Sequence, residues 1–323
     1  MKLEIKFEIK QYNPFWSNQE CNTVMPDGAR FTFSYKEKNC HIKIDCTTED
    51  RAMQLLYTIW ELLCLYDGYF YKPIQFFIDE QEKCVQELFK LNKYITAKEW
   101  ISSATLLGRN ERDLSQKIVE KYIELFSQDR KEKSMNSSMM SAYYYLKSDA
   151  YSKINIEHKL VLLMCVCDGV AFQFLGGSAS NNSGNIEILI RLLDKKRFKH
   201  GAEMLDIPTK KAINAVGNTR NELIHFSYKE NSLGSYISNL DSRTDSVANL
   251  YVFYILDVAL RIALLEAIGY KVKDDVRTYV IDEVLDWVRL VKQIDEDCVI
   301  PANQLRQMLQ KIQKGDINGF SKE

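Results

Sequence analysis

The sequence predicts an α+β fold, in which a short antiparallel sheet with one helix is followed by an all-helical bundle. Apolar and polar residues alternate in the first third of the chain, which is typical of half-buried strands. From about residue 113 onward the apolar spacing becomes helical. The 323 residues include only 5 prolines and 13 glycines, and this scarcity of breakers favours long helices.

The expected strands follow one another closely. Residues 3–9 alternate apolar side chains with lysine and glutamate, and residues 31–35 and 40–46 repeat the pattern. Residues 69–78 predict a further strand, which we expect at the sheet edge because proline cannot donate a ladder hydrogen bond.

Residues 47–50 offer N-cap side chains for an amphipathic helix that Gly68 ends. The polar residues 176–185 predict a flexible loop. The remaining helices are expected at residues 113–129, 136–150, 154–175, 186–200, 208–226, 243–268, 275–293 and 301–314.

A chain of 323 residues exceeds one comfortable core, so two domains are expected. The polar stretch 129–138 is the boundary that the composition favours. We therefore predict an α+β domain over residues 1–130, with a sensing or regulatory role, and a helical domain over residues 131–323. The core of the second domain is expected at about residues 139–270.

Charge and composition narrow the possible functions. With 43 basic and 44 acidic residues, the chain lacks the basic excess of a protein that coats nucleic acid, although a small basic site remains allowed. The start of the sequence lacks the apolar core of a signal peptide, and the apolar runs are too short for a membrane span. The eight cysteines form no CxxC motif, so we expect reduced thiols and a cytoplasmic protein.

The helix expected at residues 208–226 carries an unusual polar pattern. On a helical wheel its apolar side chains form one arc, and Arg220 lies in the middle of that arc. Asn221 and His225 belong to a separate stripe of neutral polar residues. An unpaired cation in an apolar interior is costly, so Arg220 requires an anionic partner, water or an open cleft.

Together these three side chains suit the cleavage of a phosphodiester without a metal. His225 can accept a proton near neutral pH, and the Arg220 guanidinium can hold a phosphate through paired donors. Asn221 adds a neutral group that orients the substrate. In this interpretation the histidine removes the proton of the ribose 2′-OH that attacks the adjacent phosphate.

Each residue also has an ordinary structural explanation. Arg220 could form an internal salt bridge, for example with Asp168, and His225 could be a core or surface histidine. Asn221 and the other asparagines of the helix expected at residues 208–226 could form a face exposed to solvent. Arg109 and Asn110 make a second Arg–Asn pair with no histidine after it, so such a pair alone indicates little.

The stretch RNELIH, residues 220–225, fits the R-N-x-x-x-H form of the motif of HEPN-domain proteins, and the chain resembles the ApeA-like members of that family. The resemblance covers somewhat under half of the chain. It implies an all-helical domain, often a metal-independent ribonuclease, with Arg220, Asn221 and His225 as the catalytic residues. It also implies an acidic residue on an early helix in a supporting role; Asp168 matches, although the family more often has glutamate there.

Arg220 and His225 lie about 140° apart on a straight helix, so they cannot both face one small target. Either the helix distorts or a second subunit completes the site. In-line attack also needs both a base and an acid, whereas one motif supplies one histidine. A twofold dimer would bring two motifs together, and the family resemblance implies the same arrangement.

The basic run at residues 194–201 could guide RNA through Lys195, Lys196, Arg197 and Lys199. A solvated final turn of a helix, stabilised by the helix dipole, explains the run equally well. We expect no metal site, because the acidic pairs lack nearby histidines and suit surface turns. No nucleotide-binding or serine-hydrolase motif is present, and no cofactor is expected.

These observations predict an endoribonuclease that acts on RNA as a homodimer. The family resemblance implies the cellular role of a toxin or an abortive-infection effector against phage. One alternative is a non-catalytic HEPN module that binds RNA or a nucleotide, or that serves as a protein scaffold. Another is a purely structural or sensing protein. The RNA target, the trigger and any antitoxin are not determined by the sequence.

Overall fold

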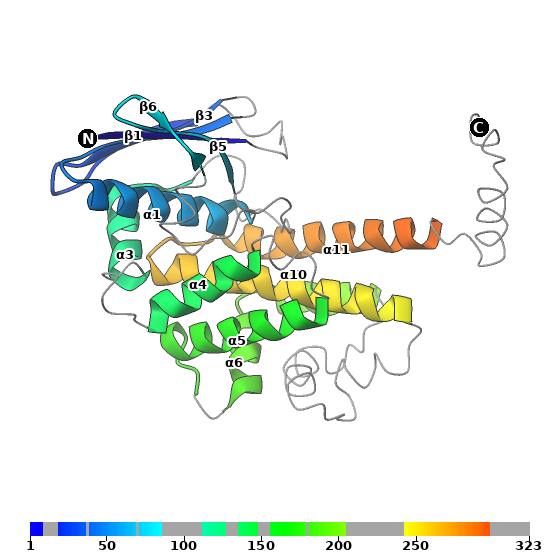
Figure 1. The fold of residues 1–323 in the computed structure, drawn as a ribbon. Helices are drawn as coiled ribbons and strands as arrows, with labels where there is room; N and C mark the ends of the chain where they lie inside the picture. Colours follow the sequence, from blue (N-terminus) through cyan, green and yellow to red (C-terminus); the bar gives the residue numbers. More distant parts are fainter. Residues whose placement is uncertain are drawn as a thin grey trace, which may run out of the picture.

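The structure is a computed structural model of the 323-residue chain. It describes residues 1–8, 19–36, 39–68, 71–85, 112–126, 135–147, 156–178, 181–204 and 242–297. In this part the chain forms one antiparallel sheet and a set of helices, so the fold is mixed α+β as predicted (Figure 1).

The sheet has six strands in the order β2-β3-β4-β1-β5-β6, and all neighbouring strands are antiparallel. The strands are β1 (Lys2–Glu8), β2 (Gln19–Val24), β3 (Arg30–Lys36), β4 (Asn39–Asp45), β5 (Lys72–Ile78) and β6 (Gln81–Lys83). The alternation of apolar and polar residues along each strand determines which side chains face the buried side of the sheet. Ile5 on β1 pairs with Ile42 on β4, which pairs with Phe33 on β3, and all three side chains are buried.

The edges of the sheet differ from the prediction. β5 was expected at an edge because of Pro73, but it pairs with β1 and with β6. The proline is tolerated because it lies beside a register shift and beyond the part of β5 that β6 covers. β6 was not predicted, because the turn before it places Asp79 and Glu80 at positive φ without a glycine to mark it. β2 was missed because its sequence is mostly polar.

Helix α1 (Glu49–Asp67) lies between the sheet and the other helices (Figure 1). Thr48 caps its first turn as expected, and Gly68 ends it in the left-handed conformation with φ of 73°. Thirteen of its side chains are buried, so the helix is covered almost all round rather than along one stripe. It therefore serves as a core helix for both the sheet and the helical layer.

The helices that follow are α3 (Gln116–Phe126), α4 (Met135–Lys147), α5 (Ile156–Phe174), α6 (Asn182–Ile190), α7 (Lys195–Met204), α10 (Ser242–Ala267) and α11 (Asp274–Asp297). Most match expected helices to within a few residues. The helices expected at residues 208–226 and 301–314 lie outside the described residues.

Two expectations about residues 176–200 were wrong. The predicted flexible loop 176–185 contains the start of α6, because Asn181 caps that helix by accepting a hydrogen bond from the Gly184 N–H. The single helix predicted at residues 186–200 is interrupted, and α7 begins only at Lys195. The basic run therefore opens a helix instead of closing one.

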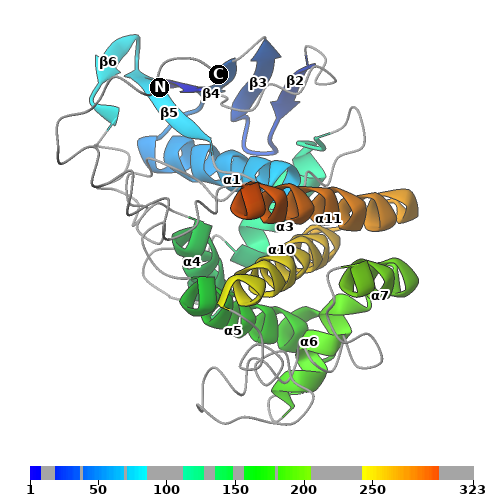
Figure 2. The ribbon, with the colours of Figure 1, turned by 90° about the vertical axis from the view of Figure 1, so that its right-hand side faces the viewer.

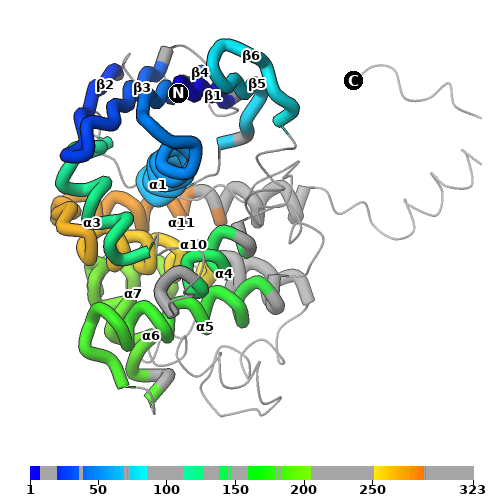
Figure 3. Tube along the Cα trace, turned by 60° about the vertical axis from the view of Figure 1, so that its left-hand side comes forward, coloured from blue at the N-terminus to red at the C-terminus, as the bar shows by residue number. Residues whose placement is uncertain are grey.

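Helix α10 is the axis of the helical part. It packs against α5, α6 and α11, and it also contacts α1 (Figure 3). From residue 251 to residue 265 every side chain of α10 is buried, which matches its nearly continuous apolar sequence.

The buried side chains of the sheet, of α1 and of the helices form one continuous cluster. The proposed domain boundary at residues 129–138 falls partly outside the described residues, so the division into two domains stays a prediction. Seven cysteines fall within the described part, and all are free thiols. Within that part, no helix combines the length and apolar character that crossing a bilayer requires.

Two buried ion pairs meet at the C-terminal end of α1. Arg112 donates from Nε and Nη2 to the two carboxylate oxygens of Asp67, at 2.9 and 3.1 Å, and Tyr71 also donates to this carboxylate. Arg261 donates to Asp257 at 3.1 Å and to the Leu65 carbonyl at 3.2 Å.

We expect Arg112→Met to lower the free energy of unfolding by about 3–5 kcal/mol, because it leaves the Asp67 carboxylate buried without its cation. The double variant Arg112→Met with Asp67→Asn should recover most of this loss. Urea denaturation measures both. Arg51→Met is the control, since its pair with Asp27 is partly exposed and should contribute under about 1 kcal/mol. Equal losses from the two single variants would contradict the prediction.

Candidate functional site

The predicted catalytic residues Arg220, Asn221 and His225 lie outside the described residues. They belong to the segment that joins Met204, the last residue of α7, to Ser242, the first of α10. The structure therefore leaves their assignment as a prediction. Any pairing of Arg220 with Asp168 likewise stays a prediction.

Asp168 lies on α5 and is half-buried. Its Oδ1 accepts a hydrogen bond from Asn185 Nδ2 on α6, at 2.6 Å. The Asn185 side chain also donates to the Ser178 carbonyl and accepts from the Ser178 N–H, at 2.9 and 2.8 Å. One buried amide thus fixes the carboxylate and the start of the loop after α5.

The loop after α5 passes so close to Asn185 and to the Ala171 carbonyl that it requires a glycine at position 177. A Cβ on Gly177 would lie 2.3 Å from Asn185 Oδ1 and 2.9 Å from the Ala171 carbonyl, so any larger residue would displace one of them. Sequence reasoning assigned Asn185 to a flexible loop and missed its role. The N-cap residue Asn181, placed just before an apolar run, was the signal that could have indicated a helix there.

The basic residues of α7 divide into two groups. Lys195 and Lys196 are exposed, and Lys199 is half-buried. Helix α7 lies beside α11 (Figure 2). Arg197 forms an ion pair with Asp282 of α11, and this pair raises the pKa of Arg197. Arg197 therefore links α7 to α11. Of the basic residues of α7, the two exposed lysines are best placed to bind an anionic partner.

The position of this run at the start of a helix also changes its electrostatics. Positive side chains are unfavourable at a helix N-terminus, where the dipole is positive. Asp194 compensates, since its Oδ1 accepts from the N–H groups of Lys196 and Arg197 at 2.9 and 3.0 Å. These hydrogen bonds, first of all the one from Arg197, lower the pKa of Asp194. The explanation by a final helical turn is thus wrong.

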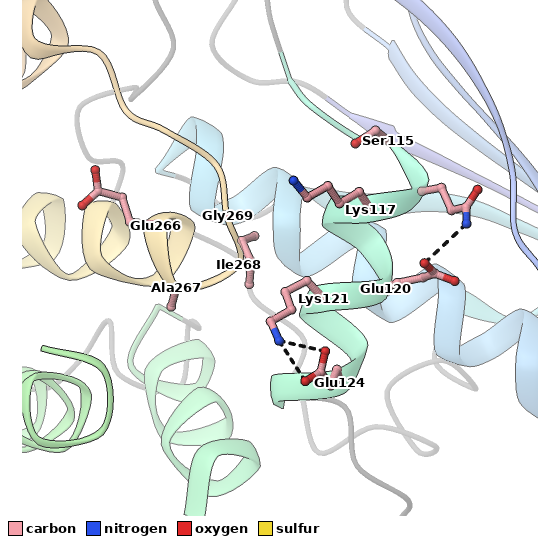
Figure 4. Close-up of a pocket in the computed structure, with 10 residues that line it drawn as sticks. Ser115, Lys117, Glu120, Lys121, Glu124, Glu266, Ala267, Ile268 and Gly269 are labelled. Atoms are coloured by element: carbon pink, nitrogen blue, oxygen red, sulfur yellow. Dashed lines mark hydrogen bonds and ion pairs between the residues drawn. The ribbon is translucent and has the colours of Figure 1, made fainter.

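A groove of about 630 Å³ lies between α3 and the end of α10 (Figure 4). Lys117 extends from α3 toward Gly269, and Lys121 turns toward Glu124, while Glu266 points away to its ion pair with Arg277. The Lys121 ammonium is held by both oxygens of Glu124, at 2.8 Å each. The lining has mixed charge and contains none of the predicted site residues, so it gives no support to a catalytic role for this groove.

The described residues contain no cluster of three or more histidine, cysteine, aspartate or glutamate side chains placed to hold a metal ion. The acidic pair at residues 274–275 lies in the first turn of α11, where the positive end of the helix dipole stabilises carboxylates. Asp275 accepts from the Val276 N–H, and Asp274 lies near Arg277. The second acidic group, at residues 295–297, has side chains that are not described.

No family model matches this chain, and no curated protein or solved structure matches it. The resemblance to HEPN domains therefore depends on the motif at residues 220–225.

We expect Asp194→Ala to lower the free energy of unfolding by about 1 kcal/mol at pH 7, the usual cost of a lost N-cap. Because folding lowers the pKa of this carboxyl, its contribution is present above the unfolded pKa of about 3.9 and is lost as the pH falls through the folded value. Urea titrations between pH 7 and pH 2.5 test this. Asp194→Asn is the control, since an asparagine caps a helix without titrating; a difference from wild type that is constant with pH for Asp194→Ala would contradict the assignment.

Proposed function

We propose that this protein is a metal-independent endoribonuclease of the HEPN type. The observation that carries the proposal is the spacing of Arg220, Asn221 and His225, three residues whose side chains together meet the needs of phosphodiester cleavage. The segment that holds them connects α7 to α10, and both of these helices contribute side chains to the buried core.

In the proposed reaction His225 removes the proton of the ribose 2′-OH, and the oxygen attacks the adjacent phosphorus. Arg220 stabilises the charge that develops on the pentacoordinate phosphorane. Asn221 orients the ribose–phosphate linkage. The bond to the 5′-oxygen breaks as that oxygen is protonated, which leaves a 2′,3′-cyclic phosphate and a 5′-hydroxyl.

The proposed active form is a homodimer. One motif supplies one histidine, whereas the reaction requires a base for the 2′-OH and an acid for the leaving oxygen. A twofold axis would place two motifs at one linkage through the same patch of each chain. This arrangement also removes the difficulty that Arg220 and His225 diverge by about 140° on one straight helix.

Two described features support roles around this centre. The Asp168 carboxylate is held in one orientation by Asn185, as a residue that supports a site through its neighbours must be. Lys195 and Lys196 are exposed on the same helical part of the chain and can attract the RNA backbone. A role as a toxin or an abortive-infection effector against phage follows from the family resemblance.

The decisive measurement is RNA cleavage in EDTA. Wild type should cut RNA and leave 2′,3′-cyclic phosphate ends, whereas His225→Ala and Arg220→Ala should lose at least about 100-fold in rate while still binding RNA. His200→Ala and Arg191→Ala are matched controls, because both residues are exposed on α7 or just before it and should cut at the wild-type rate.

Equal cleavage by wild type and His225→Ala would overturn the catalytic assignment. RNA binding without cleavage by wild type would favour the non-catalytic HEPN module. Unfolding of Arg220→Ala would indicate an internal salt bridge. Light scattering tests the dimer, and a monomer that still cuts RNA would contradict the shared site.

We expect Lys195→Glu with Lys196→Glu to weaken RNA binding and to reduce its dependence on salt, because each phosphate contact releases about one counterion. The fold should be retained, since both side chains are exposed. Fluorescence anisotropy with labelled RNA at several salt concentrations measures both effects. Lys117→Glu on α3 is the control, and an equal loss in that variant would show that net charge alone is responsible.

A further inference from the structure

The side of α5 that faces solvent is mostly apolar. The helices α4, α6 and α10 pack against α5 (Figure 2). The side that remains accessible carries five residues that are exposed or half-buried: Val161, Cys165, Asp168, Phe172 and Leu175. Four of the five are apolar, and Phe172 exposes 42% of its surface. We call these five residues the α5 seam.

The spacing of the α5 seam is that of a helix-packing surface. Its positions follow one another at intervals of four, three, four and three residues. On a helical wheel they fall within an arc of about 80°, so they form one stripe along the helix. From Val161 to Leu175 the stripe is about 21 Å long. An apolar repeat with this spacing packs against another helix by inserting side chains between those of the partner.

A helix face in contact with water normally carries charged residues. Helix α3 follows this rule, since its accessible side carries Lys117, Glu120, Lys121 and Glu124. The α5 seam has one charged residue, Asp168, and the ring of Phe172 lies close to it in sequence. The seam therefore resembles an interface more than an ordinary solvated face.

A second copy of the chain is the partner that fits the α5 seam best. The proposed ribonuclease needs two copies of its motif, and the segment that carries the motif is joined to α10, which packs against α5. A twofold dimer uses the same patch on both chains, so that patch has to be complementary to itself. The α5 seam meets this condition, because its repeat can pair with an identical repeat.

Asp168 determines the direction in which two seams pair. In a parallel pair the two Asp168 carboxylates would face each other and repel. In an antiparallel pair, about a twofold axis midway between Asp168 and Phe172, each Asp168 lies opposite Phe172 of the second copy. Cys165 then lies opposite Leu175 of the second copy, so apolar contacts form on both sides of the axis.

We propose that α5 pairs antiparallel with α5 of a second copy and that the α5 seam is the centre of the homodimer interface. The choice of partner rests on the homodimer of the proposed function, whereas the surface is taken from the described residues. One helix face buries less than the roughly 800 Å² per partner of a standard interface. We therefore expect a dimer that dissociates on dilution, with a dissociation constant in roughly the micromolar range.

Sedimentation velocity over a concentration series measures this dissociation constant. Phe172→Glu should raise it at least about 100-fold, because each dimer loses two central contacts and each new carboxylate lies opposite Asp168. Phe172→Lys removes the same ring but places an ammonium there, so it should dimerise more tightly than Phe172→Glu. Ile74→Glu is the matched control, since Ile74 exposes 43% of its surface on β5, and it should dimerise as wild type does.

Alkylation of Cys165 locates the interface without any substitution. Its thiol is exposed and belongs to the α5 seam, whereas the exposed Cys84 directly follows β6. Iodoacetamide should modify Cys165 more slowly as the concentration of wild type rises through the dissociation constant, while Cys84 should react at a constant rate. In Phe172→Glu both rates should be independent of concentration, and mass spectrometry measures them.

The proposal is overturned if wild type is monomeric throughout the series, or if Phe172→Glu dimerises as tightly as wild type. An equal loss in Ile74→Glu also overturns it, since added charge alone would then explain the effect. Equal dimerisation by Phe172→Glu and Phe172→Lys would contradict the antiparallel direction. A rate at Cys165 that does not change with the concentration of wild type overturns the proposal whether or not the variants fold.

Failure of this interface and failure of the ribonuclease proposal are distinguishable. His225→Ala should dimerise as wild type does. A dimer that depends on Phe172 but cuts no RNA would overturn the ribonuclease proposal alone. A ribonuclease whose dimer does not depend on Phe172 would overturn only the α5 interface.

Discussion

The C-terminal turn of α1 is the point at which the sheet and the helices are joined, and two buried arginines from distant parts of the sequence bind it. Arg112 follows the sheet in sequence and pairs with Asp67. Arg261 belongs to α10 and reaches the Leu65 carbonyl, 196 residues away in sequence. Arg112 also lies over the Tyr35 ring of β3, at 5.2 Å from its centroid, so one cation contacts both the sheet and α1.

Buried ion pairs of this kind add little net stability, because desolvation offsets most of the attraction. Their larger effect is on the relative position of the elements, since any arrangement that separates a pair leaves a charge in an apolar core. Tyr143 of α4 reinforces the second pair by donating to Asp257 at 2.9 Å. Sheet, α1, α4 and α10 are thereby held in one packing, and the buried cluster that they form also includes side chains of α7 and α10, the helices that flank residues 205–241.

The partners of two polar side chains of the helical part indicate which roles are open to them. Asp168 is held by a neutral amide, and Arg197 is committed to α11 through Asp282. The ribonuclease proposal would place RNA beside these helices.

The sequence alone determined the elements whose pattern is local. Period-two alternation located β1, β3 and β4, and helical spacing located α1, α5 and α10 to within a few residues, because each pattern reports which side of one element is buried. β6 and the break before α7 were missed, since a turn without glycine and a single capping aspartate give weak signals. The motif at residues 220–225 is likewise a property of the sequence, and its site stays a prediction.

Only the tertiary structure decided which buried charges meet, because Asp67 and Arg112 are 45 residues apart and no local pattern relates them. Asp257 and Arg261, four residues apart on one helix, are the pair that a sequence could suggest.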